Sequence, residues 1–268
     1  MRGKMKKRKL ANATDLRKSF ANHKQQASTT TKNLKKQQAK TLKSHRETVP
    51  FEKESSILLV GEEGDFSFAA SLIDYHHLAP EKVVATSYDS LRDLKEKYPH
   101  VQEHISSIEA SGAQIIYGID ATNLGTKILN DRKFDHIIFN FPHVGLSIKD
   151  QDRNIRANQE MLLAFFQSLQ TLLSGQGTVV ISLADTLPYT LWNIKSLARN
   201  TGLRLRTSRK FDGSMYPGYA HQCTIGERKH SWKGEERSAR MWIFERDIDE
   251  QTDNLKRKKH SSDDDDTE

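Results

Sequence analysis

Short apolar runs alternate with helical stretches along the middle of the chain, and this alternation restricts the fold more than any other feature. The spacing of apolar residues between the runs is helical. Strands that alternate with helices favour a parallel sheet covered on both faces. The predicted strands lie at 55–60, 82–89, 113–120, 134–141 and 177–183, and the predicted helices at 67–76, 90–98, 101–112, 153–175 and 187–202.

Local signals predict the ends of these helices and the last part of the sheet. Ser67 is a candidate N-cap, and Gly112, Gly175 and Gly202 are candidate helix stops. The final strands, 203–211 and 240–246, have no good helix between them and are expected to pair antiparallel. We therefore predict an α/β Rossmann-like fold with a seven-stranded, mostly parallel sheet, helices on both faces and a C-terminal antiparallel pair.

The charge distribution divides the chain into three parts. Residues 1–50 carry 15 Lys/Arg against 2 Asp/Glu, whereas residues 249–268 carry 4 against 8. Both segments have few large apolar side chains, so they are expected to be disordered tails around a folded domain at 51–248. The basic arm suits a polyanion such as nucleic acid, and "KMKKRK" (4–9) is typical of a nuclear-import signal.

Two further observations exclude classes of protein. The single cysteine, Cys223, rules out an internal disulfide framework and a cysteine zinc site. No apolar run has the length of a membrane span, and no secretory signal is evident. We expect no metal and no membrane association.

The turn after the first predicted strand is the first candidate site. Ligands of open α/β sheets bind at the carboxyl ends of the strands. Gly61 and Gly64 let the backbone approach a ligand closely, but the turn also carries Glu62, Glu63 and Asp65. These carboxylates would repel a pyrophosphate, which argues against a nicotinamide dehydrogenase. They suit a cationic ligand such as S-adenosylmethionine. An ordinary acidic turn is the alternative.

Two more acids follow the next two predicted strands. An acid at the position of Asp89 can accept both ribose hydroxyls of an adenosine. Asp120 is placed to receive the adenine amino group. Each is also compatible with a solvated strand end, but together with the glycine turn they favour a bound S-adenosylmethionine.

The segment "NFPH" (140–143) indicates the substrate. Asn140 can offer its amide to the edge of a planar, nitrogen-bearing base. Phe141 or His143 can stack on the face of that base, and Pro142 stiffens the loop. A structural loop is the alternative.

Four motifs resemble a known family: the eukaryotic large-subunit ribosomal RNA uridine-N3 methyltransferases, first found as fungal nucleolar enzymes. The motifs are "ILLVGEEGDFSFAASL" (57–72), "ATSYDS" (85–90), "FDHIIFNFPHVG" (134–145) and "MYPGYAHQCTIG" (215–226). The resemblance spans roughly 56–245. It implies a Rossmann-like fold, S-adenosylmethionine as methyl donor, large-subunit rRNA in pre-ribosomal particles as substrate, and a nuclear, nucleolar location. The protein is expected to be a monomer.

The resemblance also assigns residues, with one departure. It places cofactor contacts at Gly61, Gly64, Asp65, Phe66 and Ser67. The family's turn reads Gly-Glu-Gly-Asp/Asn-Phe-Ser-Phe, whereas this chain has one residue more, because both Glu62 and Glu63 separate the glycines. The turn is therefore expected to bulge.

Methylation of N3 requires the loss of its proton and access to the pairing edge of the base. His143 is the leading candidate for the proton acceptor, with Asp150 and Asp152 as alternatives. The aromatic residues of the late loop, Tyr216, Tyr219 and His221, either cover the flipped base or pack the hairpin.

Two other functions fit the same residues. One is an inactive RNA-binding ribosome-assembly factor, which the extra Glu of the turn favours. The other is a methyltransferase that acts on a nitrogen of adenine or cytosine, which "NFPH" permits.

Overall fold

The structure is a computed structural model that describes residues 49–62, 64–129, 131–221 and 238–247. The basic arm, the acidic tail, Glu63 and Cys223 lie outside the described residues. Every element belongs to the compact unit that begins at Phe51.

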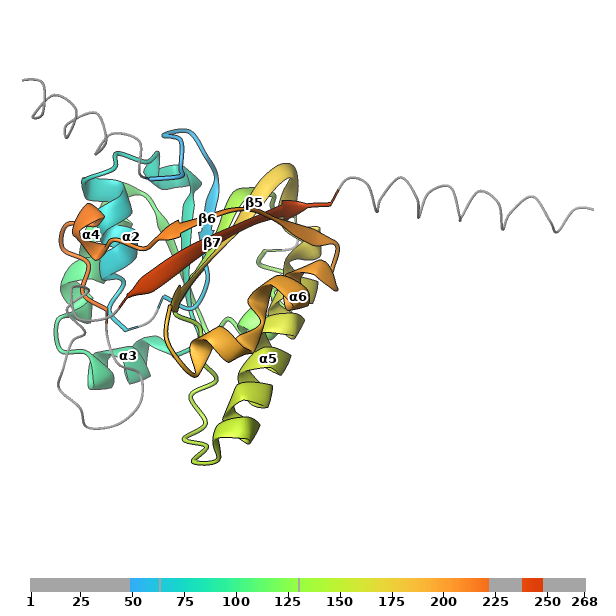
Figure 1. The fold of residues 1–268 in the computed structure, drawn as a ribbon. Coiled ribbons are helices and arrows are strands. Elements are labelled where there is room, and N and C mark those ends of the chain that lie inside the picture. Colours follow the sequence, from blue (N-terminus) through green and yellow to red (C-terminus); the bar gives the residue numbers. More distant parts are fainter. Residues whose placement is uncertain (1–48, 63, 130, 222–237, 248–268) are drawn as a thin grey trace, which may run out of the picture. The chain divides into compact units, whose positions relative to one another are not determined.

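Seven strands form one sheet in the order β3-β2-β1-β4-β5-β7-β6 (Figure 1). The first five strands are parallel, while β7 runs antiparallel to both β5 and β6. The predicted fold class is thus confirmed, including the antiparallel strands at the end. The bounds are β1 Ile57–Leu59, β2 Val83–Ser87, β3 Gln114–Tyr117, β4 Phe134–Asn140, β5 Leu173–Ala184, β6 Leu203–Lys210 and β7 Ala239–Arg246.

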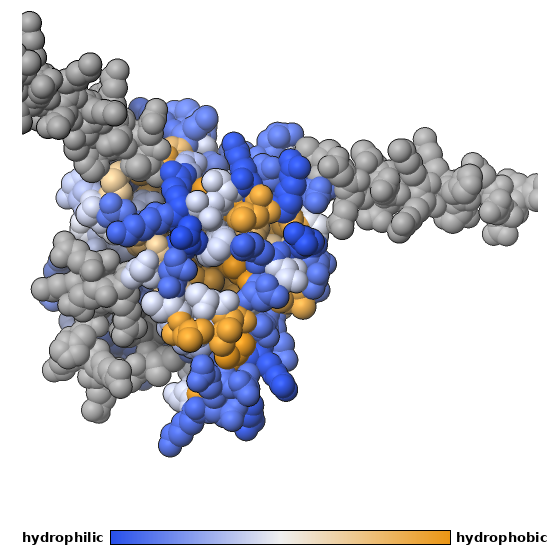
Figure 2. Space-filling model, viewed as in Figure 1, coloured by the Kyte–Doolittle hydropathy of each residue, from blue (hydrophilic) through white to orange (hydrophobic). Residues whose placement is uncertain are grey.

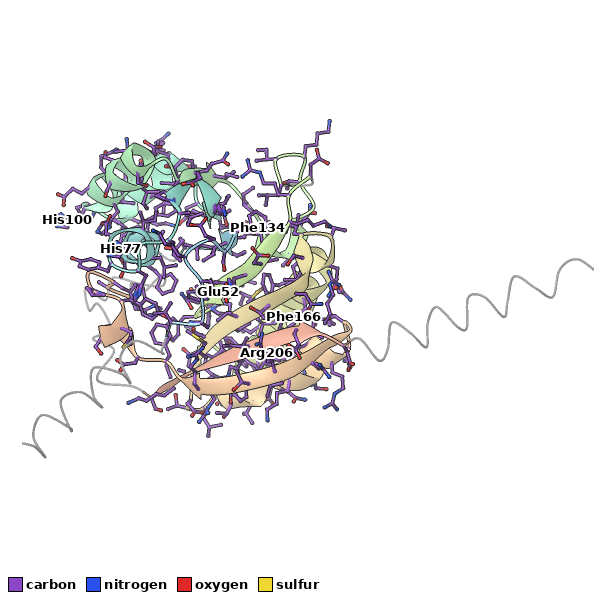
Figure 3. All side chains as sticks on the ribbon, turned by 90° about the horizontal axis from the view of Figure 1, so that it is seen from above. Glu52, His77, His100, Phe134, Phe166 and Arg206 are labelled. Carbon is purple, nitrogen blue, oxygen red and sulfur yellow. The ribbon has the colours of Figure 1, made fainter. Side chains whose placement is uncertain are left out.

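Helices lie on both sides of this sheet (Figure 1). On one side, α5 and α6 bury apolar side chains such as Phe165, Phe166 and Ala198 against β4, β5 and β7 (Figure 3). On the other side, α2 packs with α4. The helices are α2 Ser67–Asp74, α3 Leu91–Lys97, α4 Val101–Ser111, α5 Gln151–Ser168 and α6 Ile194–Arg199; short 3-10 turns are η1 Pro80–Lys82, η2 Ala121–Asn123, η3 Leu169–Thr171, η4 Tyr189–Trp192 and η5 Gly213–Met215.

Three predictions about the helices are wrong. Gly175 lies inside β5, because α5 ends at Ser168 and Leu173 already pairs with Phe134 of β4. The apolar side chains that continued the helical spacing belong to the core at the start of that strand. The predicted helix 187–202 is divided into η4 and α6 by Asn193, whose φ is +50°.

The third error concerns Ser67, which is the first residue of α2 and not its cap. Phe66 occupies the cap position with a left-handed φ of 60° and contributes no capping side chain. By contrast, α4 does end at Gly112, which has a φ of 93°. Within the described ranges, no helix combines the length and the apolar character needed to cross a membrane.

The turn after β1 requires glycine at position 61. Gly61 has a φ of +56°, and a Cβ there would lie 2.9 Å from the ring of Phe139. Gly125 is a matched control, since it has open space around it and no positive φ. We predict that Gly61→Ala lowers the free energy of unfolding by about 1–3 kcal/mol, and that Gly125→Ala changes it little. Urea denaturation of both variants measures this, and equal stabilities would contradict the assignment.

Candidate active site

The turn after β1 is held by a residue of the neighbouring strand. The hydroxyl of Thr86 on β2 donates to the carbonyl oxygen of Leu59 at 2.9 Å and accepts from the Gly61 amide at 3.3 Å. The Glu62 amide donates to the carbonyl oxygen of Thr86 at 2.7 Å. Thr86 therefore fixes where the chain leaves β1. Sequence analysis missed this residue, because nothing in the motif "ATSYDS" separates it from an ordinary buried strand residue.

Glu62 turns its side chain into the protein. The residue is only 8% exposed, and its carboxyl group accepts a hydrogen bond from the Ala69 amide at 3.2 Å. Burial raises the pKa of Glu62 to about 8, and the nearby Asp65 acts in the same direction. The expectation that Glu62 presents a negative charge on the turn is therefore corrected: at neutral pH the protonated form is favoured.

Residues 64–67 form the entry to α2. Gly64 adopts a φ of 95°, and a carboxylate oxygen of Asp65 accepts from the Ser67 amide at 3.0 Å. His104 on α4 donates from Nδ1 to the carbonyl oxygen of Asp65 at 2.7 Å. The Ser67 hydroxyl accepts from the Ala220 amide at 3.1 Å, which joins this entry to the late loop. The motif "GDFSF" thus organises the backbone around the first turn of α2.

Asp89 and Asp120 follow β2 and β3, as predicted, and each has a neighbour. The carboxylate of Asp89 forms an ion pair with Lys97 at 2.7 Å. Asp120 caps η2, accepting from the amide and the hydroxyl of Thr122 at 2.8 and 2.7 Å. A carboxylate offers about four acceptor positions, so these contacts leave room for further donors such as ribose hydroxyls.

Asn140 ends β4 and carries a buried hydrogen-bond donor on its side chain. Its side-chain oxygen accepts from the Ser182 hydroxyl at 2.7 Å. Its Nδ2 atom is buried and makes no hydrogen bond within the described part of the chain. An unsatisfied buried amide costs about 1–3 kcal/mol, so an acceptor from a bound ligand would offset a real penalty.

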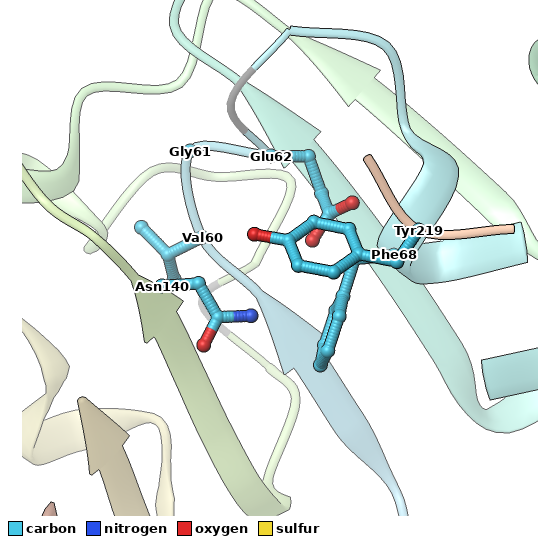
Figure 4. A pocket seen from close by; sticks show the side chains of 6 residues that line it. All are labelled: Val60, Gly61, Glu62, Phe68, Asn140 and Tyr219. Atoms are coloured by element: carbon cyan, nitrogen blue, oxygen red, sulfur yellow. The ribbon is translucent and has the colours of Figure 1, made fainter. Parts of the chain in front are cut away.

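That amide lines a narrow pocket between the ends of β1 and β4 (Figure 4). The lining residues are Val60, Gly61, Glu62, Phe68, Asn140 and Tyr219. The room inside is comparable to that of an ordered water molecule. A ligand as large as a cofactor therefore has to displace side chains such as Tyr219.

The loop after Asn140 is shaped by strain and by one buried helix residue. Phe141 has a φ of 48°, and its ring centroid lies 4.6 Å from His221 and 5.1 Å from Phe211. Pro142 is buried. The Val144 amide donates to the side-chain oxygen of Asn158, a fully buried residue of α5 that sequence analysis missed. A polar residue within the apolar face of that helix was the available signal.

The ring of His143 is held by a hydrogen bond within its own loop. Its Nδ1 accepts from the Gly145 amide at 3.0 Å, and burial lowers the pKa of the ring. The neutral ring therefore carries its proton on Nε2. Asp150 caps α5 by accepting from the Arg153 amide at 2.8 Å, and Asp152 is exposed in the first turn of that helix.

The late loop places its three aromatic residues differently. Tyr216 is 3% exposed, and its ring centroid lies 4.7 Å from that of Phe68 and 5.7 Å from that of Phe211. These contacts favour the role of packing the hairpin for Tyr216. Burial raises the pKa of its hydroxyl. Tyr219 lines the pocket, and its hydroxyl lies 3.3 Å from Nδ1 of His221. Burial lowers the pKa of His221 to about 4, so this ring is neutral at physiological pH.

Comparison with known proteins identifies the family. The profile of a family described as "rRNA (uridine-N3-)-methyltransferase BTM5-like" matches residues 58–223. The chain belongs to this BMT5-like family. The 25S rRNA (uridine(2634)-N(3))-methyltransferase of Saccharomyces cerevisiae is 31% identical to this chain in an alignment 295 positions long. That alignment covers 90% of this chain and 88% of the yeast protein.

A longer relative matches this chain over part of its own length. The ferredoxin-fold anticodon-binding domain-containing protein 1 homolog of Mus musculus is 34% identical over 180 residues, which cover 63% of this chain and 27% of the mouse protein. Among solved structures, a methyltransferase from Pyrococcus furiosus aligns with 76% of this chain and 80% of its own, at 16% identity and a TM-score of 0.45.

The buried carboxyl group of Glu62 predicts a pH-dependent stability. Because its folded pKa of about 8 lies above its ordinary value of 4.5, the folded state retains a proton that the unfolded state loses. The free energy of unfolding therefore falls as the pH rises from about 4.5 to 8. Glu62→Gln keeps a neutral side chain and removes this dependence.

We predict that Glu62→Gln gains at least about 1 kcal/mol relative to wild type between pH 5 and pH 8. Urea denaturation at both pH values and constant salt measures the gain. Glu81→Gln, which alters an exposed carboxyl, serves as control. A difference between Glu62→Gln and wild type that is the same at both pH values would contradict the burial of a protonated Glu62.

Proposed function

We propose that this chain is a methyltransferase that uses S-adenosylmethionine to methylate N3 of a uridine in large-subunit ribosomal RNA. Membership of the BMT5-like family supports the reaction. The observation that carries the assignment of the site is the amide of Asn140, which is buried beside the glycine turn in a shared pocket and has no partner in the described part of the chain.

The residues present fit such a cofactor. Gly61, Gly64, Asp65, Phe66 and Ser67 would hold it at the entry to α2, where the two glycines have positive φ. Asp89 would bind the ribose hydroxyls and Asp120 the adenine amino group. The cofactor supplies a methyl group on a positively charged sulfur. The protein then has mainly to orient the base, because the methyl donor is already activated.

Asn140 would orient the base and stabilise the charge that develops on it. Its Nδ2 can donate to O2 or O4 of a uridine, where negative charge collects as N3 loses its proton. His143 can donate from Nε2 to a second acceptor. Tyr219 and His221 would cover the base, whereas Tyr216 supports them from within the aromatic cluster.

Glu62 is the one carboxyl group among the six residues that line the pocket, and we assign it as the proton acceptor. A positive charge bound nearby lowers the pKa of a carboxyl group, so Glu62 would ionise when the cationic cofactor binds. The Glu62 carboxylate would then accept the N3 proton, and a bound S-adenosylmethionine would supply the methyl group that takes the place of that proton on N3. The pocket loses its positive and negative charges together.

The parts of the chain outside the described residues have roles in this proposal. The basic arm 1–50 would attract phosphates independently of sequence. It would also direct the protein to the nucleus and nucleolus, where pre-ribosomal particles supply the rRNA. We propose that the protein acts there as a monomer.

Analysis of modified nucleosides in rRNA tests the reaction. Large-subunit rRNA from cells that lack the protein should lose 3-methyluridine and regain it when the gene is restored. Loss of a methylated adenine or cytosine would show that another base nitrogen is the target. Unchanged rRNA, together with no binding of S-adenosylmethionine to the purified chain, would support an inactive assembly factor.

A substitution at Asn140 tests the site. We predict that Asn140→Ala lowers kcat by about 10²–10³, the usual effect of removing one donor to a developing negative charge. Transfer of a labelled methyl group to rRNA measures this rate. Asn200→Ala, at an exposed position after α6, should leave the rate unchanged. Normal activity in a folded Asn140→Ala protein would exclude the assigned role.

A further inference from the structure

Positive charge gathers at one edge of the folded unit. The strands β6 and β7 and the helix α6 contain eight Lys or Arg residues and a single acid, Glu245. The helices α3 and α4, near the opposite edge, contain three Lys or Arg residues and four acids. A count over the whole domain conceals this difference, because residues 51–248 have almost balanced charges.

Three of the four cations of β6 are exposed, whereas Arg209 is half-buried. As the last strand in the sheet order, β6 has a neighbour on one side only. The side chains of Arg204 and Arg206 are 48% and 59% exposed, and both pair with the same carboxylate, Glu245, at 3.0 and 3.7 Å. Lys210 is exposed as well. Figure 3 places Arg206 on the opposite side of the molecule from His100, which precedes α4.

The other face of this edge carries ordered cations too. Lys195 of α6 and Arg240 of β7 lie 5.2 and 5.7 Å from the ring centroid of Trp242. Arg240 is also held by Asp185 at 3.2 Å. In Figure 2, hydrophilic side chains cover most of the described surface on the face that shows β6, β7 and α6, with smaller hydrophobic patches among them.

The register of the sheet connects this edge to the pocket. Asn140 pairs with Ser182 of β5, Ser182 with Met241 of β7, and Met241 with Arg209 of β6. Three strand spacings of about 4.8 Å place Arg209 about 14 Å from Asn140. Arg204 precedes Arg209 by five residues on β6 and so lies about 17 Å from it along the strand.

Exposed cations thus line both faces of this edge, which we call the cationic track. Arg204 and Arg206 lie on the face of Glu245, whereas Lys210 pairs with Arg240 and lies with Lys195 on the face of Trp242.

We propose that this track, formed by β6 and α6, binds the phosphate backbone of the RNA strand that flanks the target uridine. The inference rests on the proposed function and adds a surface to it. Guanidinium groups bind phosphates bidentately, and a linear track suits a linear polyanion. The alternative is that Lys and Arg on an edge strand only prevent edge-to-edge pairing of sheets.

Two double variants of the full chain test the proposal. Arg206→Gln with Lys210→Gln removes two charges from the track and leaves Arg204 with Glu245. Arg92→Gln with Lys95→Gln removes two charges from α3 and is the matched control. Both variants keep the basic arm and every residue assigned to the pocket. Binding of a single-stranded oligouridylate is measured across a series of salt concentrations.

Each phosphate contact contributes about 0.7 to the slope of log K against log salt for single strands. The track variant loses two contacts, so its slope should be smaller in magnitude than that of wild type by about 1.4, or by less if one residue makes only a partial contact. It should also bind the RNA several-fold more weakly than wild type at low salt. The control should match wild type. Equal slopes and affinities for the two double variants would overturn the proposal and leave protection of the edge as the role of these residues.

Methyl transfer to large-subunit rRNA by the same protein preparations separates this inference from the proposed function. If the wild type methylates uridine and both double variants bind RNA equally, the track is wrong and the function stands. If the track variant alone loses RNA affinity while the wild type forms no 3-methyluridine, the track is supported and the function fails.

Discussion

The hydrogen bonds of Thr86 determine where the chain leaves β1, and the rest of the site depends on them. The side chain and the carbonyl group of Thr86 bind three residues at that turn: Leu59, Gly61 and Glu62. A turn held in this way can point Glu62 inward and bring Gly61 against the ring of Phe139. The glycine motif is therefore part of the sheet and not a free loop above it.

Several features that are unfavourable in free energy lie close together around that turn. Phe66 and Phe141 both have positive φ angles, which few non-glycine residues adopt. Asn140 buries an amide that has no partner among the described residues, and Glu62 buries a carboxyl group whose pKa is raised by desolvation. Strain and unsatisfied groups persist where function requires them. Their concentration at the ends of β1 and β4 supports the pocket as the place where ligand binding offsets these costs.

The side chains that line the pocket connect it to the late loop. Tyr219 and Phe68 narrow the space beside Asn140. The late loop that contributes Tyr219 is joined to α2 through Ser67 and Ala220. Binding of a cofactor at the entry to α2 would therefore directly affect the positions of the aromatic residues that cover the base.

The sequence predicted the local features of this fold better than the nonlocal ones. The five parallel strands, the antiparallel pair and the stop at Gly112 follow from periodicity and turn chemistry. The insertion of β7 between β5 and β6 does not, because it depends on pairing between segments far apart in the chain. The predicted helix stop at Gly175 was wrong, because the apolar side chains before it continue the helical spacing of α5 but belong to a strand.

The same distinction applies to the candidate site. Strand-end residues such as Asp89 and Asn140 could be located from the order of the elements. The direction in which Glu62 turns, the buried position of Tyr216 and the support from Thr86 and Asn158 could not, because they arise from packing between distant segments. The cationic track was hidden as well, since charge counts over a domain do not show how its surface is divided.

Titration calorimetry of S-adenosylmethionine into the purified full chain tests the central claim most directly, because the pocket between β1 and β4 has to accept a cationic cofactor. The account predicts saturable binding at one site, with proton release near neutral pH as Glu62 ionises, and no proton release from Glu62→Gln. An absence of binding heat from the folded protein would contradict it, as would binding whose proton release is unchanged in that variant.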